Sequence, residues 1–285
     1  MSQELGQTVR VERPIGDALP LVVDSPHSGT AYPTDFEAAL PRALLRSSED
    51  TWIDRLWGDA PAHGATLIAA EFPRCYIDPN RSLGDIDEAL LDARWPGPVV
   101  TGPKTELGIG LVWRLIGGQP IYARRLAVAE LQQRIDRCWW PYHRALAAAL
   151  TAAAVRDTPR WHLNVHSMPD DSYRRLGLPD KPLADFVLGN LDGSTSDEAT
   201  MDVLETALAA QGYSVARNDP FKGVEIVRAS GDPARGWHAV QIEVKRSLYM
   251  DAEFQPNAGY ERVHAAADAA LSALAAHARS RLAAG

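Results

Sequence analysis

Three short apolar runs along the chain predict the central strands of a sheet. They lie within Leu21–Asp24, Trp161–Ser167 and His238–Val244. Strands that are covered on both faces show such nearly continuous hydrophobic patterns. Pro26 stops the first run, because proline cannot donate to a sheet ladder. The pattern therefore predicts that His27 lies on an exposed turn at the carboxyl end of a strand, the edge at which open α/β sheets bind ligands.

The rest of the chain alternates predicted strands with predicted helices. Further strands are expected at Thr8–Arg13, as an edge strand, and at Ala65–Ala70 and Phe186–Asp192. Apolar spacing predicts helices from Ser47 to Gly64, over Arg125–Val155 with a bend at Pro141, from Asp197 to Gln211, and over Tyr260–Leu282. Residues 92–120 are rich in Gly and Pro and predict a long loop. This alternation predicts one α/β domain over residues 1–285, with a mostly parallel sheet and helices on both faces.

Composition narrows the possible partners. The 285 residues are 46% hydrophobic and 23% charged, which is ordinary for a globular protein. A formal net charge of −8 disfavours nucleic acid or an anionic membrane as a partner. Cys75 and Cys138 are too few for a disulfide framework or a thiolate zinc cluster. The sequence shows neither a leader-like start nor an apolar run long enough to span a bilayer, so we expect a cytoplasmic protein.

Two histidines and a carboxylate at strand ends point to a metal-dependent hydrolase. His27 and His166 both fall at the ends of predicted strands and could converge, although each alone fits a hydrogen-bonded surface imidazole better. A catalytic zinc site commonly uses two His and one carboxylate. The third ligand could be Glu49 or Asp50. If both begin a helix they point about 100° apart, and helical phase places Glu49 nearer the middle of the apolar face. The residues alone leave this choice open.

A serine hydrolase is an alternative to the metal site. Ser28 and Ser167 each follow a His, which suggests a Ser–His hydrolase, but adjacent side chains on a strand point to opposite faces. The chain also lacks a G-x-S-x-G elbow.

Glu243 lies inside an apolar segment, where a buried carboxylate is costly unless it has a partner or a function. A salt bridge to Lys245 or Arg246 would be the structural explanation.

Arginines near the predicted site suggest that the substrate is an anion. A guanidinium grips a carboxylate with two parallel hydrogen bonds, and a neighbouring amide can add a donor, as in the pair Asn80-Arg81. Arg74 and Arg81 flank an apolar segment that is expected to be a strand, which makes them the preferred candidates. Further candidates are Arg114, Arg228 and Arg246.

Five short motifs together resemble the N-formylglutamate amidohydrolase (deformylase) family. They are Pro26-His27-Ser28-Gly29, Glu49-Asp50-Thr51-Trp52, Phe72-Pro73-Arg74 with Ile77-Asp78-Pro79-Asn80-Arg81, Asn164-Val165-His166-Ser167, and Asn218-Asp219-Pro220-Phe221-Lys222-Gly223. The match runs in order from about His27 to Met250. Each motif is short, but the ordered set is specific.

The resemblance implies a fold, a cofactor and roles for single residues. The family is similar to zinc carboxypeptidases, with a mixed sheet covered by helices on both sides. The implied ligands of a divalent metal, most plausibly zinc, are His27, Asp50 and His166, with Asp50 preferred over Glu49 because the family carries an acid there. The implied general base is Glu243. The implied holders of the substrate's carboxylates are Asn80 and Arg81, helped by Arg74 or Arg114.

The function implied is hydrolysis of N-formyl-L-glutamate to formate and L-glutamate, the closing step of one route of histidine degradation. One departure concerns the substrate. Val224 stands where the family has a second glycine after Gly223, and a branched residue disfavours positive φ. The alternatives are an amidohydrolase for another N-formyl or N-acyl amino acid, and a non-catalytic binder of acidic amino acids.

Overall fold

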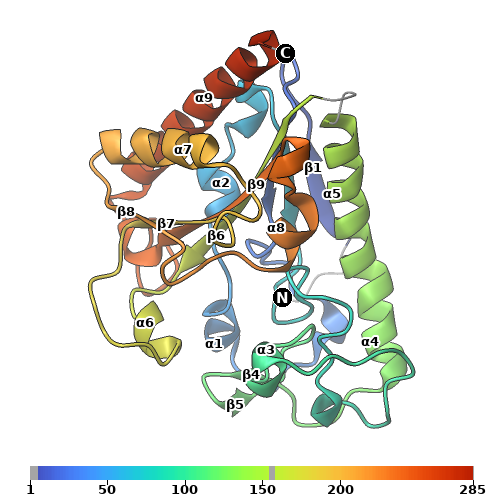
Figure 1. Ribbon diagram of the computed structural model, residues 1–285. Coiled ribbons are helices and arrows are strands. Elements are labelled where there is room, and N and C mark those ends of the chain that lie inside the picture. Colours follow the sequence, from blue (N-terminus) through green and yellow to red (C-terminus); the bar gives the residue numbers. More distant parts are fainter. Residues whose placement is uncertain (1–5, 154–157, 285) are drawn as a thin grey trace. The chain divides into compact units, whose positions relative to one another are not determined.

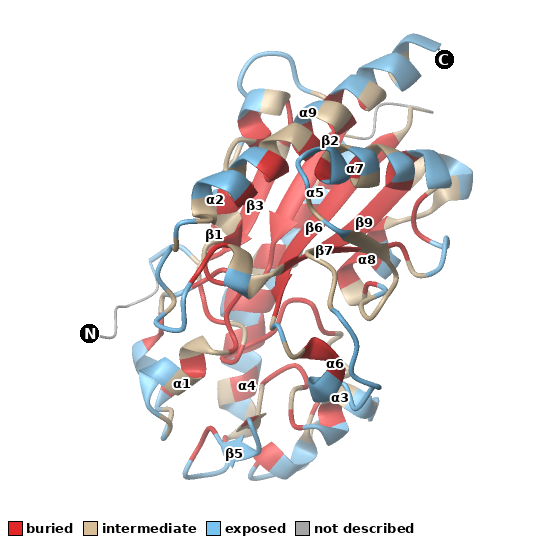
Figure 2. Cartoon of the chain, turned by 90° about the vertical axis from the view of Figure 1, so that its left-hand side faces the viewer, coloured by how far each residue is buried: buried red, intermediate tan, exposed pale blue. Residues whose placement is uncertain are grey.

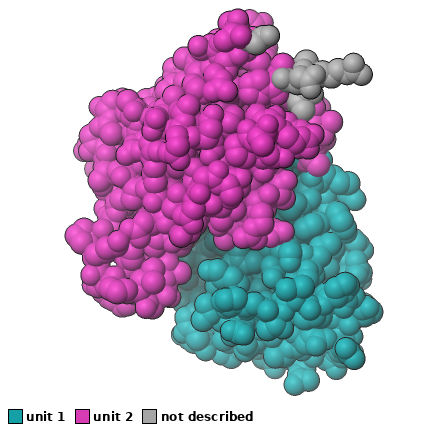
Figure 3. Space-filling view, in the orientation of Figure 1, with its two compact units in different colours: residues 1–10, 26–51, 69–146 teal, residues 11–25, 52–68, 147–285 magenta. Residues whose placement is uncertain are grey.

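The computed structural model describes residues 6–153 and 158–284. The chain divides into two compact units (Figure 3). Unit 1 comprises Met1–Arg10, Pro26–Thr51 and Ala69–Leu146, and unit 2 comprises Val11–Ser25, Trp52–Ile68 and Ala147–Gly285. The expectation of a single catalytic domain over residues 1–285 stays a prediction.

A seven-stranded mixed sheet holds the strands that the apolar runs predicted (Figure 1). Its order is β1 (Val9–Glu12), β3 (Thr66–Ala70), β2 (Leu21–Ser25), β6 (Arg160–Met168), β9 (Trp237–Lys245), β7 (Phe186–Gly189) and β8 (Val215–Arg217). Strands β2, β6 and β9 run parallel to one another. Strand β7 is antiparallel to β9 and parallel to β8. The predicted mixed, mostly parallel sheet is confirmed, and β1 is an edge strand as expected.

Helices cover both faces of the central strands. The described α-helices are α1 (Arg42–Arg46), α2 (Ile53–Leu56), α3 (Pro103–Glu106), α4 (Val128–Arg134), α5 (Trp140–Ala153), α6 (Ser172–Arg175), α7 (Glu198–Ala210), α8 (Glu225–Ser230) and α9 (Tyr260–Ala284). Apolar side chains of α2, α7 and α9 share one core with the strands. On the opposite face, α8 reaches β6 through a hydrogen bond between Ser230 Oγ and His162 Nδ1, 2.8 Å long.

The three central strands are buried along most of their length (Figure 2). One of their faces is mainly apolar, and the other carries most of their polar residues. The apolar face carries Leu21, Val23, Trp161, Leu163, Val165, Val240, Ile242 and Val244. Successive side chains of a strand alternate between faces, so the other face carries Asp24, His162, Asn164, His166, Gln241 and Glu243, all of them buried. Because buried polar groups are costly without partners or a function, this polar face is the place to search for a site.

Unit 1 has its own aromatic core. Phe36 lies 5.3 Å from Tyr76 and 5.8 Å from Tyr122, measured between ring centroids. The buried guanidinium of Arg134 lies 4.1 Å from the Tyr76 ring centroid and donates to the Tyr122 hydroxyl at 2.6 Å. A charged group at this depth is stabilised by such hydrogen bonds and cation–π contacts.

The helix predicted from Ser47 to Gly64 is wrong. The segment follows the end of α1 at Arg46 and contains the short helix α2 and a 3-10 turn over Ala60–His63. The hydroxyls of Ser47 and Ser48 donate to the carbonyls of Leu44 and Leu45. They therefore cap the end of α1 and do not begin α2. Trp52 interrupts the segment with a φ of 74°.

Two other predictions are modified. The helix expected over Arg125–Val155 consists of α4, a π-helical turn over Ile135–Trp139 and α5, while Val155 lies outside the described residues. The π turn ends two residues before Pro141. The missing N–H of this proline disturbs the regular hydrogen-bond pattern. The loop expected over residues 92–120 also contains α3 and a hairpin of β4 (Leu115–Ile116) and β5 (Gln119–Pro120).

Candidate metal centre and active site

His27 stands two residues beyond the end of β2, as the proline after the strand predicted. Its carbonyl accepts a hydrogen bond from the Asp50 amide at 2.9 Å, which ties the two residues together through the backbone. Gly29 then passes close to another segment: a Cβ there would lie 2.3 Å from the Phe72 carbonyl oxygen. Only glycine allows this approach. The expected exposure of the turn is wrong, because the side chain of His27 is 1% exposed.

The His27 ring is held between two carboxylates. Its Nε2 lies 2.7 Å from Asp78 Oδ1, and its Nδ1 lies 3.3 Å from Asp50 Oδ2. Asp78 also accepts two hydrogen bonds from Arg74, at 3.2 and 2.9 Å, and one from the Asn80 amide at 2.9 Å. Burial alone would raise the pKa of the Asp78 carboxyl, but Arg74, His27 and Arg81 together hold that pKa well below its usual value. Asp78 is therefore an acceptor for the Nε2 hydrogen of His27.

His166 lies near the carboxyl end of β6, on the polar face. Its Nε2 lies 2.6 Å from Asn164 Oδ1, which precedes it by two residues on the same strand. An amide oxygen can only accept, so His166 Nε2 carries the hydrogen and Nδ1 carries the lone pair. The same inference holds for His27, whose Nε2 hydrogen goes to Asp78. Hydrogen bonds of this kind commonly fix the orientation of histidines that bind metals.

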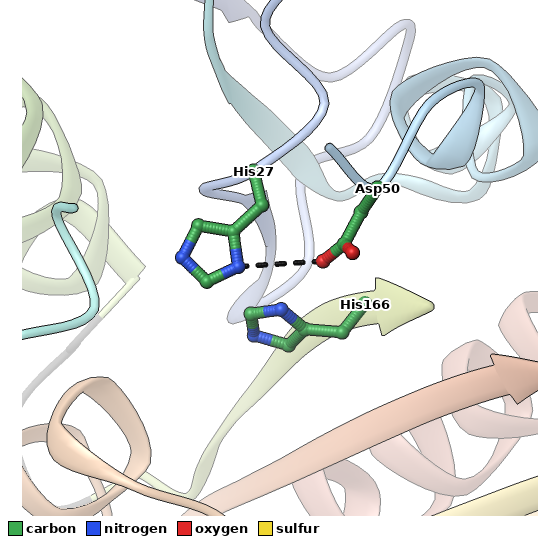
Figure 4. Close-up of side chains that lie close together, drawn as sticks. All are labelled: His27, Asp50 and His166. Carbon is green, nitrogen blue, oxygen red and sulfur yellow. Dashed lines mark ion pairs between the residues drawn. The ribbon is translucent and has the colours of Figure 1, made fainter. Parts of the chain in front are cut away.

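His27, Asp50 and His166 form a buried group that could hold a metal ion. One ligand atom from each lies within 4.8 Å of the others, and the three side chains point toward one another (Figure 4). Two imidazole nitrogens and one carboxylate oxygen match the donor set of catalytic zinc sites that keep a position open for substrate. The donor chemistry fits a cation, because both rings carry their hydrogen on Nε2 and their lone pair on Nδ1.

Glu243 lies beside His166 in the sheet. The parallel pairing of β6 and β9 puts the two residues in register, so their side chains leave the sheet on the same face. Gln241 Nε2 donates to Glu243 Oε1 at 2.9 Å. Lys245, one of the two cations that a structural role of Glu243 could use, pairs with Asp185 at 2.7 Å. Arg246 donates to Ser167 Oγ at 3.0 Å.

Comparison with known proteins identifies the family of the chain. A family model described as N-formylglutamate amidohydrolase matches residues 19–250. The chain belongs to this family. It is 31% identical to the N-formylglutamate deformylases of Pseudomonas putida and Pseudomonas aeruginosa, over 82% of this chain and 82% and 84% of theirs. The crystal structure of an N-formylglutamate amidohydrolase from Ralstonia eutropha JMP134 is similar, with a TM-score of 0.94 at 47% identity, over 96% of this chain and 99% of that chain.

The structure separates the two acids that the sequence left as alternatives. Glu49 is turned toward other partners: it accepts hydrogen bonds from the hydroxyl of Tyr32 at 2.5 Å and of Thr51 at 3.0 Å, and pairs with Arg46 at 3.3 Å. Burial raises the pKa of its carboxyl. Asp50, and not Glu49, joins the two histidines. Both acids lie after the end of α1 and outside a helix, so helical phase does not decide which of them faces the histidines.

The arginines are placed differently from the expectation of a flanked strand. Residues 74–81 form turns, and Arg74 and Arg81 both approach Asp78, with Arg81 Nη1 3.7 Å from Asp78 Oδ2. Arg81 also donates to the carbonyls of Ile109 and Asn80. Arg114 pairs with Asp87 at 2.6 Å and is partly exposed. The exposed Arg228 pairs with Glu225 at 3.4 Å.

Val224 fits its position without strain. It has a φ of −136°, and Gly223 supplies the positive φ of the loop at 100°. A second glycine is therefore not required by the backbone, and the departure at Val224 gives no support to a different substrate.

Sequence reasoning missed the roles of three buried residues. Asp78 belongs to one of the family motifs, but the sequence does not indicate that its carboxylate contacts the ring of His27. Asn164 Oδ1 lies 2.6 Å from His166 Nε2, and Asn164 Nδ2 donates to Asp24. A signal was present in β6, where His162, Asn164 and His166 recur every second residue and so share one face.

Proposed function

We propose that this protein hydrolyses the formamide bond of N-formyl-L-glutamate to give formate and L-glutamate, the closing step of one route of histidine degradation. The ligands of a divalent metal, zinc, would be His27, Asp50 and His166. The observation that carries the proposal is this buried group of two imidazoles and one carboxylate in a chain of the N-formylglutamate amidohydrolase family. The names of the two Pseudomonas relatives supply the substrate.

The metal and Glu243 would divide the chemistry. A zinc ion at this site would polarise the formyl oxygen and lower the pKa of water toward neutrality. Glu243 takes the proton of the attacking water and returns it to the nitrogen of the departing glutamate. Its place beside His166 in the sheet and its hydrogen bond from Gln241 support this role. A positioned base of this kind commonly contributes a factor of about 10²–10⁴ to the rate.

Charge around His27 suits a substrate with two carboxylates. The positive charges of Arg74 and Arg81 are matched by the negative charges of Asp78 and Asp50. A bound divalent cation would therefore leave this cluster positive, against the negative charge of the whole chain. We propose that Asn80 and Arg81, helped by Arg74 or Arg114, hold the substrate's carboxylates. Arg81→Lys should then impair hydrolysis of N-formylglutamate far more than that of an uncharged formamide.

A panel of N-acyl substrates tests the proposal. Zinc-loaded protein should release formate from N-formyl-L-glutamate, should lose this activity on chelation, and should recover it with zinc. N-acetyl-L-glutamate should be a poor substrate, because the extra methyl group must fit beside the reacting carbonyl. Equal rates on formyl and acetyl compounds would indicate a general N-acyl amidohydrolase. Binding of N-formylglutamate without turnover would indicate a non-catalytic binder.

A further inference from the structure

On the polar face, a buried row of hydrogen-bonding residues lies next to His166 and Glu243. The row includes the residues two positions before them on their strands. Strand pairing aligns Asp24 with Asn164, and Asn164 with Gln241. Their side chains are buried, at 0%, 0% and 4% exposure. Two rungs of the sheet are thus polar. The outer rung holds the proposed ligand His166 and base Glu243, and the inner rung holds their neighbours.

Each residue of the outer rung is bonded to the amide two positions before it on its own strand. Asn164 Oδ1 lies 2.6 Å from His166 Nε2, and Gln241 Nε2 lies 2.9 Å from Glu243 Oε1. A side-chain amide accepts through its oxygen and donates through its NH₂ group, so its orientation decides whether a neighbour meets an acceptor or a donor. The group that sets the orientation of Asn164 therefore controls what His166 can do.

Asp24 sets the orientation of the Asn164 amide. Asn164 Nδ2 donates to Asp24 Oδ1 at 2.9 Å. A carboxylate only accepts, so the NH₂ end of Asn164 faces Asp24 and its oxygen faces His166. The same Asp24 oxygen lies 2.7 Å from His162 Nε2, and His162 Nδ1 lies 2.8 Å from Ser230 Oγ. These contacts keep Asp24 in place.

We propose that Asn164 is a positioning residue that locks His166 in the Nε2–H tautomer, so that Nδ1 is presented to the metal, and that Asp24 holds Asn164 in the orientation that this requires. The proposal rests on the proposed function only in taking His166 as a metal ligand. If Asn164 turned its amide over, its NH₂ group would face His166 Nε2. His166 would then carry its hydrogen on Nδ1, the atom that must bind the metal.

The tautomer can be observed in the metal-free wild-type protein. Long-range ¹H–¹⁵N correlation spectra in mildly alkaline buffer distinguish Nε2–H from Nδ1–H rings. His166 should show a single Nε2–H tautomer. An Nδ1–H ring, or a mixture of the two tautomers, would overturn the proposal. This measurement needs neither a variant nor activity, so its result stands even if the substrate is a different N-acyl amino acid.

Zinc affinity of variants supplies the second test. Asn164→Leu removes the acceptor at similar size and should weaken zinc binding about 10–100-fold, the usual effect of losing a residue that orients a ligand. The matched control is Gln241→Leu, which removes an equally buried amide from the neighbouring strand. It should leave zinc affinity unchanged and lower only the turnover rate. Zinc binding by Asn164→Leu that equals wild type would contradict the proposal.

An exchange of the two side chains separates positioning from folding. In the double variant Asp24→Asn with Asn164→Asp, residue 164 still accepts the Nε2 hydrogen of His166, and the number of buried charges is unchanged. Zinc affinity should return to within about threefold of wild type, even where thermal unfolding shows lower stability than in Asn164→Leu. A merely structural role predicts instead that zinc affinity follows stability, and that result would overturn the proposal. Failure of wild-type protein to bind zinc would count against the metal site itself.

Discussion

The Nε2 nitrogen of His27 lies 2.7 Å from Oδ1 of Asp78, and the Asp78 carboxylate is at the same time shared by Arg74 and Arg81. One buried acid therefore orients the proposed metal ligand and balances two guanidinium groups. Its side chain is 0% exposed, and those of Arg74 and Arg81 are 15% and 7% exposed. The metal site and the stability of this region thus depend on the same carboxylate.

Replacing Asp78 by alanine should lower both stability and zinc affinity. Losing one partner of a buried ion pair costs about 3–5 kcal/mol, so urea unfolding of the metal-free protein should show a loss of this size. Asp171→Ala removes an exposed pair with Arg175 and should cost about 0–1 kcal/mol. Equal losses in the two variants would show that Asp78 does not hold the arginines.

Substitution of the two neighbouring acids should affect metal binding differently. Asp50→Asn weakens one of three ligands and should lose zinc and formate release together, while the protein stays folded. Glu49→Gln keeps the hydrogen-bonding shape toward Tyr32 and should retain zinc. Elemental analysis after gel filtration measures both. Retention of zinc by Asp50→Asn together with its loss from Glu49→Gln would reverse the assignment.

His238 should make the protein less stable in weak acid. Burial lowers the pKa of its ring; Asp197 opposes this shift, while Arg281 and His277 add to it. The unfolded chain therefore binds the proton more tightly than the folded chain. The contribution of the neutral His238 ring to the stability of the fold is present above the pKa of His238 in the unfolded chain, about 6.5. It is lost as the pH falls from that value toward the lower pKa of His238 in the folded chain.

The contribution of His238 can be isolated by substitution. One proton changes the slope of unfolding free energy by at most about 1.4 kcal/mol per pH unit. His238→Asn should flatten the curve of unfolding free energy between about pH 5 and 7. His63→Asn, at a partly exposed histidine paired with Asp268, is the comparison. An unchanged slope of unfolding free energy against pH in His238→Asn would mean that burial does not lower the pKa of His238.

Glu243→Gln should separate catalysis from metal binding. The amide keeps the size of the carboxylate but cannot take a proton, so turnover should fall by about 10²–10⁴. Zinc content and KM should change little, because the lost interaction acts in the transition state. Near-normal turnover would make Glu243 a structural residue, and loss of zinc would make it a ligand.

The sequence predicted the scaffold of the site well. The runs of β2, β6 and β9 were recognisable because apolar residues fill one face of each strand. The carboxyl ends of parallel strands meet at one edge of a sheet. His27 and His166 were therefore expected to converge. The family resemblance, and not the residue pattern, preferred Asp50 to Glu49.

Other features depend on contacts that local sequence does not encode. Ser47 and Ser48 fit the start of a helix by residue type, but their hydroxyls donate to the carbonyls of Leu44 and Leu45 at the end of α1, a bond that serine also makes. Asp78 meets His27 across 51 residues of chain, and no spacing rule predicts that pairing.

Among the described helices, none is long and apolar enough to cross a membrane.

Titration of metal-free protein with zinc, followed by formate release from N-formyl-L-glutamate, tests the central claim most directly. Activity should rise in proportion to added zinc and reach its plateau at about one ion per chain, as three protein ligands of one site require. Asp50→Asn should show no such rise. Formate release by fully metal-free protein, or saturation with zinc without any formate release, would contradict the account.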